Sequence, residues 1–242
     1  MKASHGVVLL SGPEDDIEIE ALMRFRLYYE GPLRSTQGEP QGQQKNPLAL
    51  HKHTIRKEFH RQLKELWATD KFLSTSILHW DAELDITPQG AKVAHWGGGD
   101  DSSGPMADVI ASRYQQFGYQ FVPLVREEDH LLCSLRILFL RRDPPGSVLT
   151  AGDIDNRLKT LIDALRLAAS GQELAGSETP QAGENPFFCL LRDDKQVTHL
   201  EVETDNLLEP LTPEDADRSK VRVIITIELR PYYVTMNNLS FA

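Results

Sequence analysis

The spacing of apolar residues changes around residue 150 from a continuous run to a helical repeat, and this change constrains the fold of the chain more than any other feature. Residues 131–141 form a nearly continuous apolar run that ends at Asp143-Pro144-Pro145-Gly146, which predicts a buried strand followed by a turn. From Asp153 onward the apolar residues recur at i, i+3, i+4 and i+7, which predicts an amphipathic helix ending near Gly171. A buried strand beside such a helix favours a sheet covered by helices.

Period-two and period-3.6 patterns place the other elements along the chain. Alternation predicts strands, and the basic segment with one apolar face predicts a second helix. The expected strands are 23–29, 196–203 and 220–230, the expected helix is 51–67, and an apolar run lies at 187–191. Their order predicts an α+β fold in which a mixed β-sheet has helices packed on one face.

The length of 242 residues is compatible with a single domain that carries an insertion. We expect one domain over 1–242, with its core at about 21–72 and 130–232 and a large insertion at about 73–120. The insertion contains a glycine-rich loop at 97–104 and a short helix at 106–117, and further loops are expected at 35–46 and 171–186.

The charge of the chain restricts which partners it can bind tightly. The formal net charge is −10, from 26 Lys+Arg and 36 Asp+Glu, whereas a nucleic-acid binder normally presents a positive surface. The charges are segregated, because basic residues concentrate in 24–72 and acidic residues in 169–218. The acidic excess weighs against tight nonspecific binding of duplex DNA, but it need not face the same partner as the basic segment.

The apolar segments and cysteines indicate where the protein resides. The N-terminal apolar run at 7–10 is too short for a signal peptide or a membrane span, so we expect a cytoplasmic protein with no membrane partner. Cys133 and Cys189 lie in apolar surroundings without a metal-ligand spacing, which predicts two reduced thiols.

The predicted helix at 153–169 opens with a motif that can carry chemistry. Asp153-Ile-Asp155-Asn156-Arg-Leu-Lys159 begins it, and Asp155, Lys159 and Asp163 fall along one border of its apolar stripe. Acidic residues in a first helical turn also suit the N-cap and the helix dipole, so the motif alone is compatible with a structural role.

A second acidic pair, Asp193-Asp194, directly precedes a predicted strand. Carboxylates brought together repel one another unless a cation neutralises them, and hard oxygen ligands select Mg²⁺ or Mn²⁺. The two motifs therefore predict a metal site if they converge. Lys159 would then either pair with a carboxylate or stabilise charge on a phosphoryl oxygen.

Taken together, Asp153-x-Asp155-Asn156-x-x-Lys159-x-x-x-Asp163-Ala-Leu followed by Asp193-Asp194-x-Gln-Val resembles the signature of the RusA-type Holliday-junction resolvase family. The resemblance covers about residues 150–204. It implies a RusA-like fold and a homodimeric, Mg²⁺-dependent or Mn²⁺-dependent endodeoxyribonuclease that hydrolyses phosphodiester bonds in branched DNA, such as Holliday junctions, in DNA recombination and repair.

Matching the motif residue by residue assigns a role to each position. The resemblance implies that Asp153, Asp155 and Asp194 bind metal and that Lys159 is the catalytic lysine. Weaker candidates are Asn156, Asp163 and Asp193, of which the first two would orient the site. The chain is longer and more acidic than the family pattern, which bears on the substrate, and its insertion could bind a partner protein.

The basic helix and its histidines have two interpretations each. Arg56, Lys57, Arg61 and Lys64 could contact DNA phosphates, or they could form an ordinary solvated helix face. His51, His53 and His60 could bind a second metal, although surface histidines are the better interpretation. An EF-hand is excluded, because Leu158 and Ala164 stand where that loop requires glycine and glutamate.

Two other function classes compete with a nuclease. A non-catalytic nucleic-acid-binding or protein-binding subunit on the same scaffold would suit the acidic composition and the insertion. A phosphatase using the same carboxylates would also suit the acidity. Cleavage of a four-way junction distinguishes the nuclease from the first alternative, and turnover of a chromogenic phosphate ester identifies the second.

Overall fold

The computed structural model describes residues 23–33, 47–78, 86–87, 90–91, 104–141, 153–174, 177, 179–208, 220–234, 238 and 241. Within these ranges the side chains of Pro47, Leu78, Asp153 and the residues at 86–87 and 90–91 are not described. Several expected features lie outside the described residues: the apolar run at 7–10, the loop at 35–46, most of the glycine-rich loop and the turn at 143–146.

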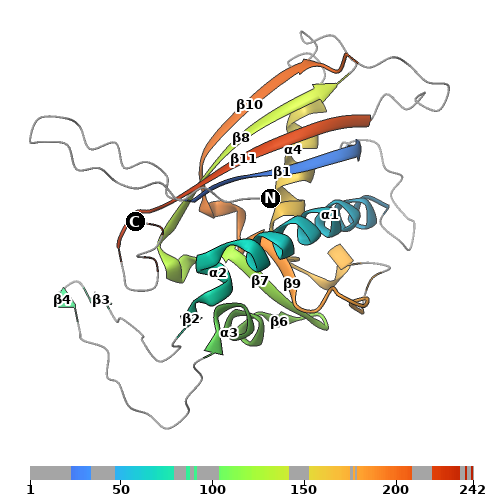
Figure 1. The fold of residues 1–242 in the computed structure, drawn as a ribbon. Helices are drawn as coiled ribbons and strands as arrows, with labels where there is room; N and C mark the ends of the chain where they lie inside the picture. Colours follow the sequence, from blue (N-terminus) through green and yellow to red (C-terminus); the bar gives the residue numbers. More distant parts are fainter. Residues whose placement is uncertain are drawn as a thin grey trace, which may run out of the picture.

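A four-stranded sheet in the order β1-β11-β8-β10 forms the main layer (Figure 1). β1 (Met23–Pro32) pairs antiparallel with β11 (Lys220–Pro231), which pairs antiparallel with β8 (Leu131–Arg141), and β8 pairs parallel with β10 (Val197–Asn206). The expected mixed α+β fold is therefore confirmed. β11 is an inner strand of this sheet, and its alternate side chains are buried.

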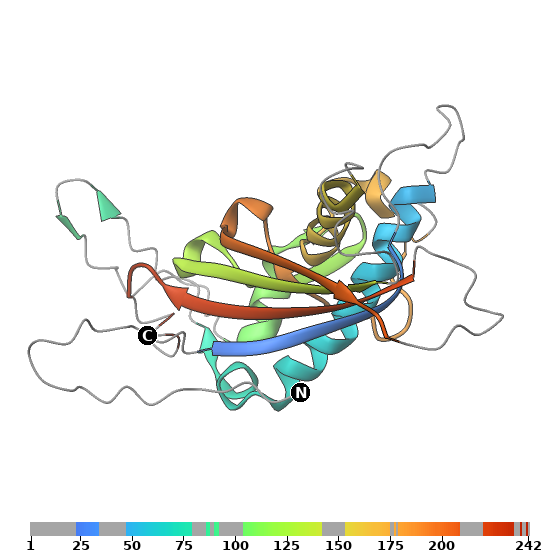
Figure 2. The same cartoon turned by 90° about the horizontal axis from the view of Figure 1, so that it is seen from above.

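The helices lie largely on one side of this sheet. They are α1 (Pro47–Thr69), α2 (Lys71–Thr75), α3 (Met106–Arg113) and α4 (Asp153–Leu165). Figure 1 shows α4 behind the sheet, and Figure 2, seen from above, places it on the same far side. Within the described residues, no helix is both long and apolar enough to cross a membrane.

A three-stranded sheet and short elements complete the described chain. The strands are β6 (Gln115–Gln116), β7 (Tyr119–Val125) and β9 (Phe187–Leu191), with β7 and β9 parallel. Two-residue pairs join β2 (Ile77–Leu78) to β5 (Gly104–Pro105) and β3 (Ile86–Thr87) to β4 (Gly90–Ala91). The 3₁₀ turns used below are η1 (Glu127–Asp129), η3 (Gly171–Leu174) and η4 (Asp194–Gln196).

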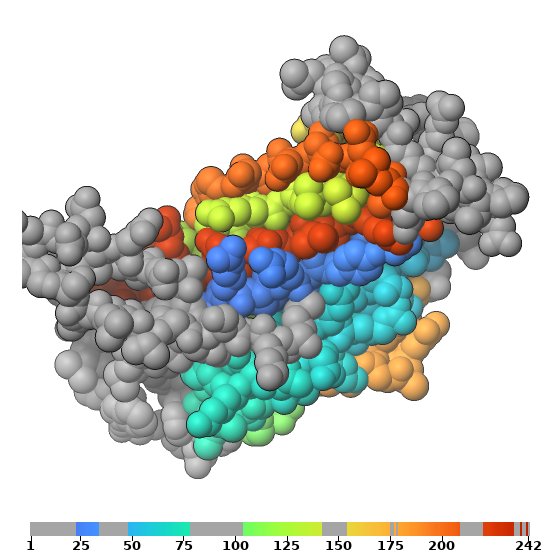
Figure 3. Space-filling model, turned by 45° about the horizontal axis from the view of Figure 1, so that its top comes forward, coloured from blue at the N-terminus to red at the C-terminus, as the bar shows by residue number. Residues whose placement is uncertain are grey.

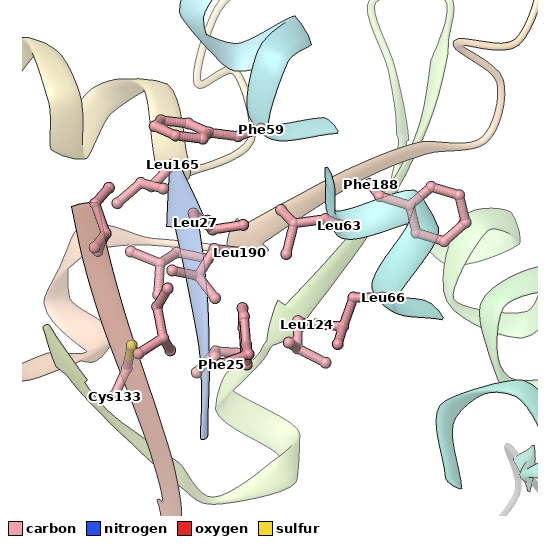
Figure 4. Close-up of a cluster of buried hydrophobic side chains, with 14 of the residues drawn as sticks. Phe25, Leu27, Phe59, Leu63, Leu66, Leu124, Cys133, Leu165, Phe188 and Leu190 are labelled. Carbon is pink, nitrogen blue, oxygen red and sulfur yellow. The ribbon is translucent and has the colours of Figure 1, made fainter. Parts of the chain in front are cut away.

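One apolar core joins the main sheet, the helices and the small sheet. Figure 4 shows Phe25 and Leu27 of β1 beside Phe59, Leu63 and Leu66 of α1, together with Leu165, Leu190 and Leu124. Side chains within the expected insertion, such as Leu73 and Ile110, belong to the same core. Burial raises the pKa of the Cys133 thiol to about 12, so this free cysteine stays protonated at neutral pH.

Two predicted helices end earlier than their hydrophobic pattern indicates. α3 stops at Arg113 rather than Phe117, because Phe117 and Gly118, both at positive φ (53° and 79°), form the two-residue turn between β6 and β7. α4 stops at Leu165, because Arg166 forms a parallel bridge with Leu191. The apolar residues after Leu165 therefore pack beside β9 without being helical.

Candidate functional site

α4 presents the first acidic motif to solvent on a helix whose other side is anchored in the core. Leu161 and Leu165 are fully buried, and Leu158 packs partly against the same core. Beside this apolar face, Asp155 and Lys159 are exposed one helical turn apart. In the described part of the chain, neither of these two side chains forms a hydrogen bond or an ion pair, so both charges are available to a ligand.

The other positions of the first motif have structural partners or no described side chain. Asp153 begins α4, but its carboxylate lies outside what the structure describes. Asn156 is half-buried, and its carbonyl oxygen accepts a hydrogen bond from the Thr160 hydroxyl at 3.0 Å.

Asp163 is buried at the centre of an ionic network. One oxygen of its carboxylate pairs with Lys52 Nζ at 2.5 Å, and the other pairs with the Arg166 guanidinium at 3.3 Å. Arg166 also bonds Glu173 of η3 at 2.9 Å. Asp163 is therefore neutralised by two cations. Because a helix rises 1.5 Å per residue, it lies about 12 Å along α4 from Asp155.

Arg56 belongs to this network and not to a surface. Its side chain is 1% exposed. Its guanidinium donates hydrogen bonds to the carbonyl oxygens of Asp163 and Arg166, at 2.9 and 3.0 Å, and to the Glu173 carboxylate at 2.9 Å. The expectation that Arg56 contacts DNA is wrong, because these buried bonds use the guanidinium to close the C-terminal end of α4.

The remaining basic residues of α1 are also partly engaged. Lys57 pairs with Glu184 at 2.8 Å, and Lys64 Nζ donates to the Gly183 carbonyl at 3.0 Å. Arg61 is well exposed and pairs with Glu58 of its own helix. Much of the basic character of α1 thus stabilises the loop at 181–184, and Arg61 is the better exposed candidate for a phosphate contact.

The histidines of α1 were expected at the surface, and for two of them this is wrong. His53 and His60 are 1% and 2% exposed, because α1 packs a second face against β9 and β7. The His60 ring stacks on Phe187 at 4.3 Å between ring centroids, and its Nδ1 accepts the N–H of Phe188. Both ring nitrogens of His53 lack a hydrogen-bond partner within the described structure.

The second acidic motif forms a capped 3₁₀ turn. Asp193 Oδ1 accepts the N–H of Lys195 at 3.0 Å, and Gln196 Oε1 accepts the N–H of Asp193 at 3.0 Å, so the two residues form a capping box. The Lys195 N–H, the Asp194 side chain and the charges of Lys195 and Arg166 lower the pKa of Asp193. Asp193 therefore serves as the cap, whereas Asp194 is exposed.

The second motif follows the strand that lies beside the C-terminal end of α4. Arg166, directly after α4, forms a parallel bridge with Leu191 of β9, and η4 begins three residues after Leu191. Among the side chains that the structure describes, no three His, Cys, Asp or Glu residues form a group that could hold a metal ion. Asp155, Asp193 and Asp194 therefore do not form such a group by themselves, and the carboxylate of the fourth candidate, Asp153, lies outside the described side chains.

The chain was compared with known proteins by sequence and by structure. No protein-family model, curated protein or solved structure matches it. The resemblance to the RusA-type family therefore depends on the two motifs, at 153–165 and 193–197.

Proposed function

We propose that this chain is a divalent-metal-dependent endonuclease that hydrolyses phosphodiester bonds in branched DNA as a homodimer. The observation that carries the proposal is the exposed face of α4, where Asp155 and Lys159 stand one turn apart. An Asp and a Lys at this spacing commonly pair on a solvated helix, but here each keeps its charge available. Asp163 on the same helix is neutralised by two cations, whereas the charge of Asp155 is available to a ligand.

The donor chemistry suits Mg²⁺ or Mn²⁺, since the candidate ligands are carboxylate oxygens. Asp153 and Asp155 of α4 and Asp194 of η4 would hold the ion. Asp194 is preferred over Asp193 because Asp193 is committed to the capping box. When bound, such an ion supplies a Lewis acid that lowers the pKa of water and neutralises phosphate charge.

The side chains of the chain itself would bind and orient the substrate. The ammonium group of Lys159 would stabilise negative charge on the phosphoryl oxygens. Arg61 would contact a backbone phosphate, a contact that favours binding without sequence preference. The Asp163 network would hold α4 in place, so that these groups keep their relative positions.

The test compares Asp155→Asn with the matched control Asp108→Asn, which removes the same charge from an exposed position in the first turn of α3. The full chain is assayed on four-way-junction, flapped, duplex and single-stranded DNA in Mg²⁺, Mn²⁺ or EDTA. We expect Asp155→Asn to lower junction cleavage by roughly 100-fold or more while junction binding persists. The control should cleave as the wild type does; full activity of Asp155→Asn in Mg²⁺ would reject the proposal.

A non-catalytic binding subunit is the second candidate, and two observations favour it. The described carboxylates do not form a three-membered group, and Arg56 is turned into the core. Binding of the junction without cleavage in either metal would support this candidate. Hydrolysis of a chromogenic phosphate ester with no action on DNA would instead indicate a phosphatase.

A further inference from the structure

β10 is a long edge strand with an open side. It runs for ten residues and pairs with β8 along one side. Its central residues, from Thr198 to Glu203, are all exposed. Apart from the N–H of Asn206, which donates to the neighbouring Asp205 side chain, no backbone group on the side of β10 away from β8 has a hydrogen bond within the described residues. A strand in this state presents a row of N–H and C=O groups on which another strand can pair.

The opposite edge of the same sheet is closed. The side chain of Gln62 in α1 accepts the N–H of Tyr28 at 2.9 Å and donates to the Tyr28 carbonyl at 2.6 Å, so it occupies the middle of the β1 edge. Figure 3 shows the difference: α1 lies directly against β1, whereas β10 forms the other border of the sheet. An additional strand can therefore pair with the β10 edge and not with the β1 edge.

The two faces of β10 carry different chemistry. Leu200 and Val202 are aligned with the buried Leu135 and Ile137 of β8, yet they are 41% and 37% exposed. They continue the apolar face of the sheet beyond the part that the core covers. Exposed apolar side chains next to unpaired backbone favour addition of a strand that carries apolar residues on the same face.

The other face of β10 is acidic. Glu201, Glu203 and Asp205 follow one another at every second position, and Arg136 of β8, 3.3 Å from Glu201, is the cation nearest to them among the described ion pairs. In an antiparallel pair of two β10 strands centred on Val202, Glu201 of each copy would face Glu203 of the other. Like charges directly opposite destabilise a pair, so a second copy of this strand is disfavoured.

We propose that β10 binds an extended segment of a partner protein by strand addition. The segment alternates basic side chains, which face Glu201, Glu203 and Asp205, with apolar side chains that pack beside Leu200 and Val202. Backbone hydrogen bonds supply part of the affinity, and the charge pattern supplies the specificity. This binding surface is independent of the metal-dependent activity proposed above.

The test titrates the full chain with a synthetic peptide of the length of β10 that alternates lysine and valine. Calorimetry measures affinity, and amide hydrogen exchange locates the contact. We expect slower exchange along β10, and we expect the double variant Glu203→Lys/Asp205→Lys to bind about tenfold more weakly. The matched control Glu65→Lys/Asp108→Lys makes the same charge change at exposed positions elsewhere and should bind as the wild type does.

Two further peptides separate strand addition from simple attraction to an acidic protein. A peptide with glutamate in place of lysine should not bind, and a peptide N-methylated at every second residue should lose binding because it cannot pair its backbone. Equal binding of the N-methylated peptide, or binding without protection of β10, overturns the proposal. A wild-type dimer in sedimentation that Glu203→Lys/Asp205→Lys alters would also overturn it, because a second copy would then occupy the edge.

Discussion

Replacing Arg56 with alanine tests the buried ionic network most directly. The guanidinium bonds two carbonyl oxygens, of Asp163 and Arg166, at the end of α4, and it pairs with Glu173 of η3. The last carbonyl groups of a helix have no partner within the helix. Arg56→Ala therefore removes three hydrogen bonds at once and leaves buried acceptors without a donor.

The size of the effect follows from this geometry. Removing one member of a buried charged pair costs about 3 to 5 kcal/mol. Because the Glu173 side chain is 21% exposed and keeps its bond to Arg166, we expect the lower end, about 3 kcal/mol. A small domain has a free energy of unfolding of about 5 to 15 kcal/mol, so the loss is a large fraction of the total. Arg56→Lys keeps the positive charge but loses the planar set of guanidinium N–H donors, and we expect the free energy of unfolding to fall by about 2 kcal/mol.

Urea denaturation followed by circular dichroism measures these differences. The matched control is Arg61→Ala, which removes an exposed guanidinium from the same helix and should change the free energy of unfolding by less than about 0.5 kcal/mol. If Arg56→Ala unfolded at the wild-type urea concentration while its affinity for a DNA junction fell, Arg56 would face DNA and the reasoning would be refuted.

Two further predictions concern pH. Burial, with the charges of Arg56 and Lys57, lowers the pKa of His53 to about 4. The unfolded chain therefore binds a proton between about pH 6.5 and 4 that the folded chain does not, so His53 costs stability as the pH falls through this window. The free energy of unfolding of His53→Phe minus that of the wild type should be larger at pH 5 than at pH 8 by on the order of 2 kcal/mol, as measured by urea titration. An equal difference at the two pH values would contradict the burial argument. The Tyr28 hydroxyl and Arg222 lower the pKa of Glu30 to about 2, so its contribution is present above about pH 4.5 and is lost as the pH falls towards 2. Glu30→Gln should cost less than about 1 kcal/mol at pH 7 and nothing at pH 2, and an equal cost at both pH values would argue against the pairing.

Local periodicity predicted the elements that bury one regular face. The strand over 131–141 is confirmed as β8, and the pattern of 220–230 is confirmed as β11. β7 was not predicted, because its apolar residues are interrupted by Gln120 and Pro123 and lie next to a segment interpreted as an insertion. Its burial comes from parallel pairing with β9, more than sixty residues later, which no local pattern reveals.

The second buried face of α1 was missed for a related reason. His53, Arg56 and His60 recur at helical spacing and are all buried. All three can carry charge, so the pattern indicated a solvated basic face. Their environment depends on Phe187 and Glu173, which the fold brings from distant segments. The spacing was visible in the sequence, but the partners that make its burial favourable were not.

The buried network also explains how α4 can present reactive groups at a fixed position. Lys52, Arg56 and Arg166 hold the C-terminal half of the helix, where Asp163 is neutralised, and this leaves the half that carries Asp155 and Lys159 exposed. A functional side chain is effective when a rigid element supports it. Arg166 also forms a backbone bridge with Leu191 of β9, so the anchored end of α4 lies beside the strand that leads into the second acidic motif. The two motifs that resemble a nuclease signature are therefore both connected to this anchored end of α4.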